Sequence, residues 1–159
     1  MQKLVKVISG GQTGADRAAL KAAKSKGIPT GGCMPRGFLA HDGEHPEFAS
    51  LYGMHQSGSP EYPPRTEENV RVADATIRFA TNFNTRGEKL TEKMIHRHRK
   101  HGLSVDLEKN YLRPKDVARW LVENNVRVLN VAGNSEKRSP GIEARVEAFL
   151  LEVFSVLPP

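Results

Sequence analysis

The chain has 159 residues, and 24 Lys and Arg against 18 Asp and Glu give it a formal net charge of +6. This length is enough for one domain with a hydrophobic core, and no apolar run approaches the roughly 18 residues of a membrane-spanning helix. We therefore expect a single domain over residues 1–159 without a membrane or signal segment and, because the single Cys33 cannot form a disulfide within the chain, a cytoplasmic location.

The first predicted unit is a strand, a glycine loop and a helix. Residues 4–8 form a short apolar run that stops at Ser9, the string GGQTG follows, and an alanine-rich helix is predicted from residue 15 to Gly27. Alanines at helical spacing let this helix lie close to a sheet: Ala15, Ala18, Ala19, Ala22 and Ala23. Beyond the helix, residues 28–32 are predicted to form a short second strand.

Residues 33–64 are predicted to form a long surface loop, since they are rich in Gly, Pro, His and Ser and show little periodicity. Loops of this length inside compact domains are usually functional or disordered. Because this one follows the glycine loop and the short second strand, we interpret it as a candidate lid over a ligand.

The middle of the chain carries most of the charge. Thr66 is predicted to cap a helix whose first turn holds Glu67 and Glu68. Residues 75–79 are predicted to form a strand, and residues 87–100 a basic helix. Between residues 86 and 101 there are six Lys or Arg against two Glu. The basic face of the helix predicted over residues 87–100 either is exposed to water or faces the phosphate of a ligand. Because no aromatic residue lies in it for a base to stack on, nucleic acid is not an expected partner.

The last third of the chain repeats the alternation of strand and helix. A strand is predicted over residues 103–107, a helix from Pro114 to residue 125, a strand over 126–133, and a final helix that begins at Pro140. This alternation predicts an α/β three-layer sandwich, with a mostly parallel sheet and helices on both faces. Ligands of such sheets bind beyond the carboxyl ends of the strands.

The first glycine loop is a candidate anion site. Between a strand and a helix start, free backbone N–H groups and the helix dipole favour a phosphate, and the loop consists of Gly10, Gly11, Gln12, Thr13 and Gly14. The string is neither GxxxxGK(S/T) nor GxGxxG, so a tight turn without a ligand is the alternative. Asp16, in the first helical turn, is expected either to bind ligand hydroxyls or to cap amides.

Two further segments have suitable chemistry. Residues 132–141 connect a strand to a helix and offer small residues, cations and backbone amides. Arg65, Thr66, Glu67 and Asn69 open another predicted helix and are candidates to close over a ligand. As an alternative, Arg65 and Glu67 are only an exposed ion pair, which contributes little stability.

Four segments resemble those of a known family: GGQTGADRAAL at 10–20, GIPTGGCMPRGFLAHDG at 27–43, RTEENVRVADATIRF at 65–79 and VLNVAGNSEKRSPGI at 128–142. They are similar to the molybdenum cofactor carrier family, in the circularly permuted branch of the Rossmann-like SLOG superfamily. The resemblance covers nearly the whole chain. It implies a Rossmann-like fold, a homo-oligomer, a phosphate-bearing ligand such as molybdopterin or a nucleotide, and a molybdoenzyme as a candidate acceptor.

The resemblance also implies positions for the ligand site. The phosphate-facing loop comprises Gly10, Gly11, Thr13, Gly14 and Asp16, with Arg36 and Gly37 beside it; the second block is Arg65, Thr66, Glu67 and Asn69, and the third is Gly133 and Ser135. The chain departs from the family pattern at two places. Residues 84–88 read NTRGE where a Ser-x-Gly-Thr loop is expected, and Asn134 replaces an expected Pro.

Complete metal or catalytic motifs are missing from the sequence. On a helix, the side chains of His96 and His98 would point about 200° apart, and they are surrounded by Lys and Arg. The histidines near residues 41–45 have no recognised ligand spacing, and Cys33 has no evident His partner in the sequence. No metal site is therefore expected. Hydrolases of the wider superfamily carry a motif resembling PGGxGTxxE, a string that this chain lacks. The sequence thus favours a non-catalytic carrier. The alternatives are a nucleotide sensor or an enzyme that cleaves the N-glycosidic bond of nucleoside monophosphates, with Glu67 as its acid or base.

Overall fold

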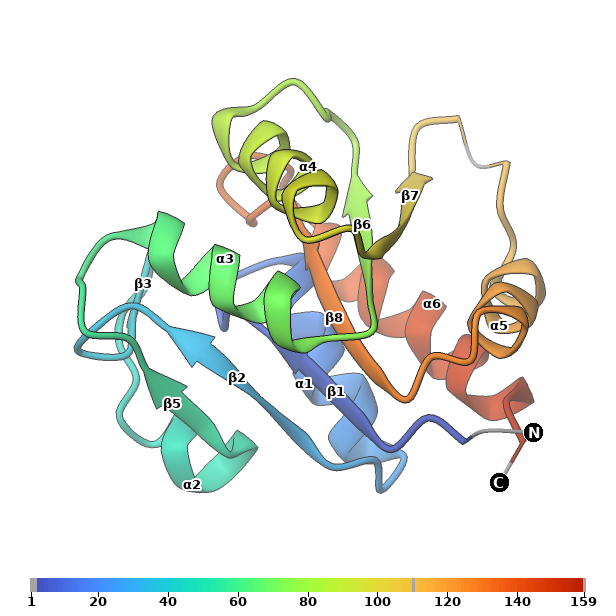
Figure 1. Cartoon of the computed structure of the whole chain (residues 1–159), viewed down its shortest axis with the longest axis horizontal. Helices are drawn as coiled ribbons and strands as arrows, with labels where there is room; N and C mark the ends of the chain where they lie inside the picture. The colour runs from blue at the N-terminus through green and yellow to red at the C-terminus, as the bar shows by residue number, and fades with distance from the viewer. Residues whose placement is uncertain (1–2, 110, 159) are drawn as a thin grey trace.

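The computed structural model describes residues 3–109 and 111–158. Its main feature is a six-stranded parallel sheet in the order β5-β2-β1-β8-β6-β7 (Figure 1). The strands are β1 (Lys6–Ser9), β2 (Thr30–Met34), β5 (Met54–Gln56), β6 (Ala75–Ala80), β7 (His101–Asp106) and β8 (Val128–Gly133). Strand β8 lies between β1 and β6, so the last strand of the chain pairs with the first at the centre of the sheet.

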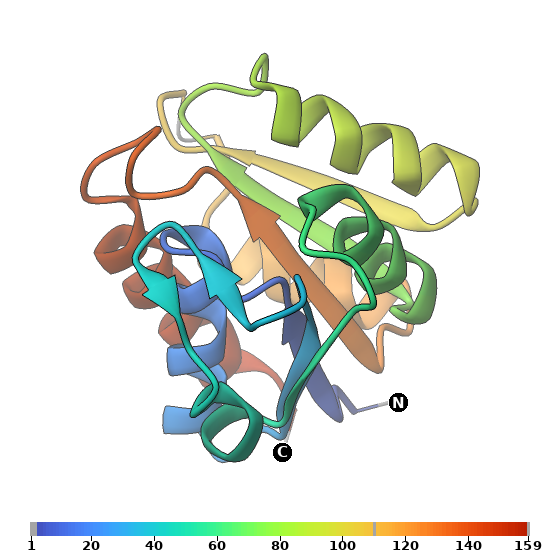
Figure 2. The same cartoon turned by 90° about the vertical axis from the view of Figure 1, so that its left-hand side faces the viewer.

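Helices cover both faces of this sheet, which confirms the predicted Rossmann-like α/β sandwich. One face carries α1 (Ala15–Ser25), α5 (Pro114–Glu123) and α6 (Ile142–Val156), and the other carries α3 (Tyr62–Val72) and α4 (Arg86–Arg97). In Figure 2 the sheet lies between α1 and α6 on one side and α3 and α4 on the other. No helix of the described residues is long and apolar enough to cross a membrane.

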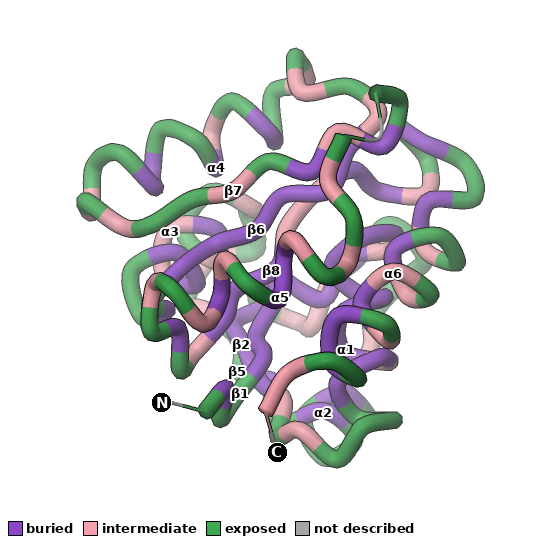
Figure 3. The backbone as a smooth tube through the Cα atoms, turned by 90° about the vertical axis from the view of Figure 1, so that its right-hand side faces the viewer, coloured by how far each residue is buried: buried purple, intermediate pink, exposed green. Residues whose placement is uncertain are grey.

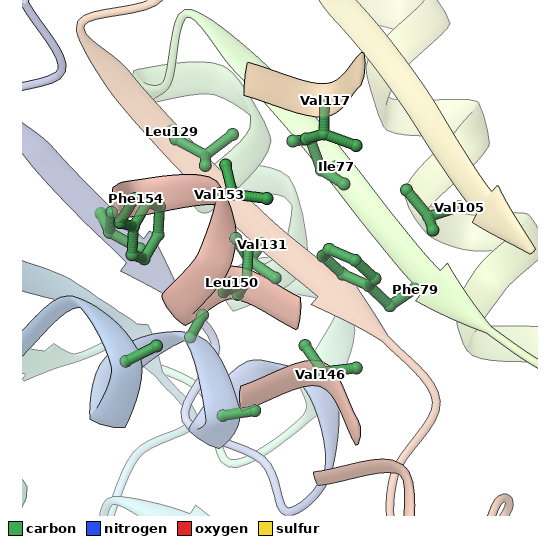
Figure 4. Close-up of a cluster of buried hydrophobic side chains, with 14 of the residues drawn as sticks. Ile77, Phe79, Val105, Val117, Leu129, Val131, Val146, Leu150, Val153 and Phe154 are labelled. Atoms are coloured by element: carbon green, nitrogen blue, oxygen red, sulfur yellow. The ribbon is translucent and has the colours of Figure 1, made fainter. Parts of the chain in front are cut away.

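The core is packed closely around α1 and α6. All five alanines of α1 that the sequence singles out are fully buried, and α1 lies against α6 and β8. Figure 4 shows side chains of α6, among them Val146, Leu150 and Val153, directed at β8 and β6. Strand β6 is buried along its whole length (Figure 3), as is typical of a parallel strand covered on both faces. Each such aliphatic side chain contributes about 1.5–3 kcal/mol by leaving water.

The prediction of one long loop over residues 33–64 is wrong. This segment contains the end of β2, a hairpin of β3 (Leu39–Ala40) and β4 (Gly43–Glu44), the short helix α2 (Phe48–Tyr52), strand β5 and the first turn of α3. These elements are two to five residues long, apart from α3, and are interrupted by Gly and Pro, so they have no periodicity to detect. Strand β5 exists because it pairs with β2, whose residues lie 22 positions earlier in the chain, as in the pair of Gly32 and Met54.

Helix α3 begins at Tyr62, four residues before the predicted cap Thr66. Pro63 and Pro64 occupy its first turn, where the missing N–H groups of proline remove no intrahelical hydrogen bond. Thr66 therefore lies inside the helix, and its Oγ1 accepts a hydrogen bond from Arg65 Nη1 at 3.0 Å. As a result, residues 65–69 lie within α3 rather than at its N-terminus.

The connections between the strands open a crevice at one edge of the sheet. The neighbouring strands β8 and β6 continue on opposite faces of the sheet: β8 leads into α6, on the same face as α1, whereas β6 leads into α4 on the other face. Loops that leave neighbouring strands toward opposite faces open a crevice at the carboxyl ends of the strands. The loops after β1, β8 and β6 meet at this point.

Candidate functional site

A cavity of about 750 Å³ lies at the carboxyl ends of β1, β8 and β6, between the N-terminal turns of α3 and α4. This volume is typical of sites for small molecules and cofactors. Side chains and backbone from six segments line it: Gln12 and Asp16; Leu39 and His41; Pro60, Glu61, Tyr62, Pro63, Arg65 and Thr66; Thr85, Arg86, Gly87, Glu88, Leu90 and Thr91; Ala132, Gly133, Asn134 and Ser135; and Arg138.

The two predicted glycine loops touch each other beneath the cavity. Gly14 is the residue before α1 and has φ 88°, a conformation that favours glycine. A Cβ on Gly14 would lie 2.8 Å from Cα of Ser135, so only glycine lets the two loops approach this closely. Gly133 has φ 150°, and a Cβ there would lie 2.8 Å from Cβ of Ala15. The glycines thus bring α1 against the end of β8.

Gln12 and Asp16 form the floor of the cavity on the β1 side. The Gln12 side-chain oxygen accepts hydrogen bonds from the N–H groups of Thr13 at 3.0 Å and His41 at 2.8 Å. Asp16 accepts from the Gln12 N–H at 3.3 Å and lies 3.8 Å from Nη2 of Arg65. Burial raises the pKa of Asp16 to about 6, although Arg65 opposes this shift.

Glu88 forms the opposite wall, in the first turn of α4. Thr85 caps this helix by accepting a hydrogen bond from the Glu88 N–H at 3.2 Å. The Glu88 side chain is buried, its Oε1 has no hydrogen-bond partner within the described residues, and Nη1 of Arg78 lies 3.8 Å away. Burial raises the pKa of Glu88 to about 7, Arg78 opposes the shift, and the charge of Asp16 adds to it.

Two buried carboxyl groups with raised pKa values therefore face one cavity. Such shifts are frequent at sites that bind ligands or transfer protons. Arg65, Arg86 and Arg138 also line the cavity, from α3, α4 and the loop after β8. These three guanidinium groups and the nearby helix N-termini give the cavity an environment suited to an anion.

The structure brings about half of the expected site residues to the cavity. The residues that line it are Gln12, Asp16, Arg65, Thr66, Gly133 and Ser135. Gly10, Gly11, Thr13 and Gly14 lie in the same loop as Gln12 but are not among the lining residues. Their surroundings are tightly packed: the Arg65 guanidinium lies against Gly10, and the Met34 side chain lies against Gly11.

Four further expected site residues also lie outside the cavity lining and have other partners. Arg36 donates from Nη1 to the Gly58 carbonyl at 3.0 Å, and the Gly37 N–H donates to the Gln56 side chain at 2.7 Å. Glu67 binds Nε2 of His98 at 2.8 Å, which lowers its pKa. Asn69 binds the backbone of Cys33 through both atoms of its amide, at 2.8 and 3.0 Å.

The sequence interpretation missed Thr85 and Glu88 as site residues. Their spacing matches the Thr and the last Glu of PGGxGTxxE, and this match was the available signal: the segment from Ala80 to Glu88 reads ATNFNTRGE. Of the basic segment between residues 86 and 101, Arg86 lines the cavity, whereas Lys89 and Lys93 are exposed and do not.

The predicted lid segment is tied to the floor of the site. Its hairpin places Leu39 and His41 in the cavity wall. Arg17, at the start of α1, forms an ion pair with Asp42 in the turn of that hairpin, and Nη2 of Arg17 also donates to the Gly11 carbonyl at 3.2 Å. The arginine thus connects the hairpin to the first glycine loop.

The family described as the circularly permutated YpsA SLOG family matches residues 7–154. A crystal structure named "Putative molybdenum carrier protein", from Syntrophus aciditrophicus SB, is 37% identical in sequence, has a TM-score of 0.85, and its match covers 95% of this chain and 94% of that one. Among curated proteins none matches. The family match extends over all the segments that line the cavity.

Proposed function

The chain belongs to the circularly permutated YpsA SLOG family, and we propose that it is a carrier that holds a phosphate-bearing ligand, of molybdopterin or nucleotide type, in the cavity at the carboxyl ends of β1, β8 and β6. The observation that carries this proposal is the convergence of Arg65, Arg86 and Arg138 with the first turns of two helices on one cavity of about 750 Å³. A carrier requires such a cradle and no nucleophile.

The wall formed by α3 suits a planar ring system. Tyr62 is half-buried there, the Arg65 guanidinium carbon lies 5.3 Å from the centre of its ring, and the rings of His41 and Tyr62 meet edge to face at 6.0 Å. Pterins and purines both present a flat heterocycle linked to phosphate, so this wall fits either one. The printed name of the similar crystal structure favours a molybdenum-containing cargo.

The cargo is identified by native mass spectrometry of the chain purified from cells that synthesise the molybdenum cofactor. A bound mass of a molybdopterin species supports the cofactor carrier, and a bound nucleotide supports the nucleotide form of the proposal. Self-association and transfer to a molybdoenzyme remain parts of the proposal, and the same spectra report the oligomeric state.

A matched pair of variants tests the site itself. Arg138 lines the cavity, whereas its neighbour Lys137 is also exposed and does not line it. Arg138→Ala is expected to weaken binding of the identified ligand roughly 10- to 100-fold, the effect of losing one charge-assisted hydrogen bond, and Lys137→Ala to change it little. Equal effects of the two substitutions in calorimetric titrations would contradict the location of the site.

A second candidate function rests on Glu88 and Asp16. A buried carboxyl with a pKa of about 7 that faces a cavity is suited to donate or accept a proton, so an enzyme that cleaves nucleoside monophosphates is the alternative. Its acid or base would be Glu88 rather than Glu67, which binds His98 outside the cavity. Release of free base from a panel of nucleoside monophosphates, lost in Glu88→Gln, would favour the enzyme over the carrier.

A further inference from the structure

Three side chains with metal-binding chemistry meet on the α3 face of the sheet, apart from the residues that line the cavity. They are Cys33 of β2, His55 of β5 and Glu68 of α3, and one potential ligand atom of each lies within 4.8 Å of the other two. Cys33 and His55 are register partners in the parallel β2–β5 pair, so their side chains project from the same face of the sheet. Helix α3 packs over β2 and supplies Glu68.

We propose that Cys33, His55 and Glu68 bind one Zn²⁺ ion. Thiolate, imidazole and carboxylate are the three ligand types that zinc uses in proteins. Tetrahedral Zn²⁺ at bond lengths of about 2.0–2.3 Å holds its ligand atoms about 3.3–3.6 Å apart. Because the three ligand atoms already lie within 4.8 Å of one another, side-chain rotations that move each atom by about 1 Å bring them to these distances.

The backbone around the cluster is held in place. The Asn69 side chain accepts a hydrogen bond from the Cys33 N–H at 2.8 Å and donates to the Cys33 carbonyl at 3.0 Å. It occupies the ladder position just beyond the last β1–β2 pair, Ile8 with Gly31. Since Asn69 follows Glu68 directly, this clamp fixes the carboxylate of α3 against the thiol of β2. Such support distinguishes a built site from a chance cluster on the surface.

The cluster also has an entry path and a free coordination position. Cys33 is buried, whereas the side chains of His55 and Glu68 are 60% and 33% exposed. Nε2 of His55 already forms a hydrogen bond with the Glu68 carboxylate. The ion takes the place of the proton in that bond, and the proton moves to Nδ1 of the same ring or, from an imidazolium, to water. On binding, the Cys33 thiol loses its proton to water and becomes the thiolate ligand, and a water molecule completes the tetrahedron.

Other histidines of the chain are less suited to a metal ion. Both ring nitrogens of His45 are engaged, with Asp42 at 2.8 Å and Glu47 at 3.2 Å, and Asp42 is paired with Arg17. His98 binds Glu67. Within residues 3–109 and 111–158, the Cys33, His55 and Glu68 cluster is the group of three or more such side chains whose ligand atoms converge.

Cobalt(II) is the probe for this site, since it adopts zinc geometry and its bond to a thiolate gives an intense charge-transfer absorption in the near ultraviolet. Chelator-treated full-length protein titrated with Co²⁺ is expected to show this absorption, to saturate at one ion per chain, and to lose it on addition of Zn²⁺. His55→Ala and Glu68→Gln are expected to weaken Co²⁺ binding by more than the roughly 10- to 100-fold that loss of an outer-shell partner causes. His101→Ala, an exposed histidine outside the cluster, is the matched control and should bind as the parent does.

Cys33→Ser should abolish the thiolate absorption, and circular dichroism shows whether this buried position still folds. The proposal is overturned if the parent shows no thiolate-to-cobalt absorption, or if His55→Ala, which changes a largely exposed side chain, binds Co²⁺ as tightly as His101→Ala. Binding in the cavity is scored separately, because the metal titration contains no phosphate ligand.

Discussion

Glu88 offers the sharpest test of how the site is held within the fold. Its pKa rises from an ordinary value of 4.5 to about 7 on folding, so the folded chain binds the proton more tightly than the unfolded chain does. The stability associated with the protonated carboxyl is fully present below about pH 4.5 and is lost as the pH rises through 7. At 1.36 kcal/mol per pKa unit, the full loss is about 3 kcal/mol.

Glu88→Gln removes this ionisation while it keeps the shape of the side chain. The variant is expected to exceed the parent in free energy of unfolding by about 1 kcal/mol at pH 5 and about 3 kcal/mol at pH 8. Urea unfolding followed by circular dichroism measures both values. A variant less stable than its parent at pH 8, or a difference that does not grow with pH, would show that Arg78 keeps Glu88 ionised in the fold and would refute the reasoning from burial.

Glu92→Gln is the matched control. Glu92 lies on the same helix and 3.8 Å from the same Arg78, but its side chain is 54% exposed. Exposed ion pairs contribute little, so this substitution should change the stability by less than about 0.5 kcal/mol at both pH values. The contrast between the two glutamates separates the effect of burial from the effect of the shared arginine.

Two other positions give predictions of opposite kinds. Gly14→Ala should destabilise the fold by more than about 2 kcal/mol in urea unfolding, because φ is 88° and a Cβ would collide with the loop after β8. Gly87 has open space around it, so Gly87→Ala should stabilise α4 by roughly 0.5–1 kcal/mol. Stability changes of the same sign for both substitutions would contradict the geometry. Arg17→Ala should speed proteolytic cleavage within the β3–β4 hairpin, because the ion pair with Asp42 holds that hairpin to α1, and unchanged cleavage would show that the pair does not restrain it.

The sequence predicted those elements whose signals are local. The apolar runs of β6 and β8 and the helical spacing in α1 and α6 each lie within one segment of the chain, and these elements are present within a few residues of the expected bounds. Strand β5 has no such signal. It is three residues long and exists only because β2 lies beside it, so a pairing between distant segments decides its structure.

The site was predictable to the same extent. Glycine loops after strands identified Gln12, Asp16 and Gly133, since their chemistry follows from the loop itself. Glu88 was not identified, because whether a glutamate of α4 faces water or a cavity depends on how that helix packs on the sheet. The proximity of His55 to Cys33 was not predicted for a similar reason, because the two residues become neighbours only through the pairing of β2 with β5. The single domain, the homo-oligomer and the cytoplasmic location stay predictions.

The position of β8 at the centre of the sheet has a consequence for biosynthesis. Strand β1 pairs with β8 from Lys6 with Val128 to Ser9 with Val131, so 122 residues separate the first partners along the chain. At about 5–20 residues per second on the ribosome, β1 is made roughly 6–24 s before its partner. Until then one edge of β1 is open, and the cavity, whose floor needs the loops after both strands, cannot form. The cavity is therefore among the last parts of the newly made chain to assemble, and the proposed ligand can bind there only after the final strand has been inserted.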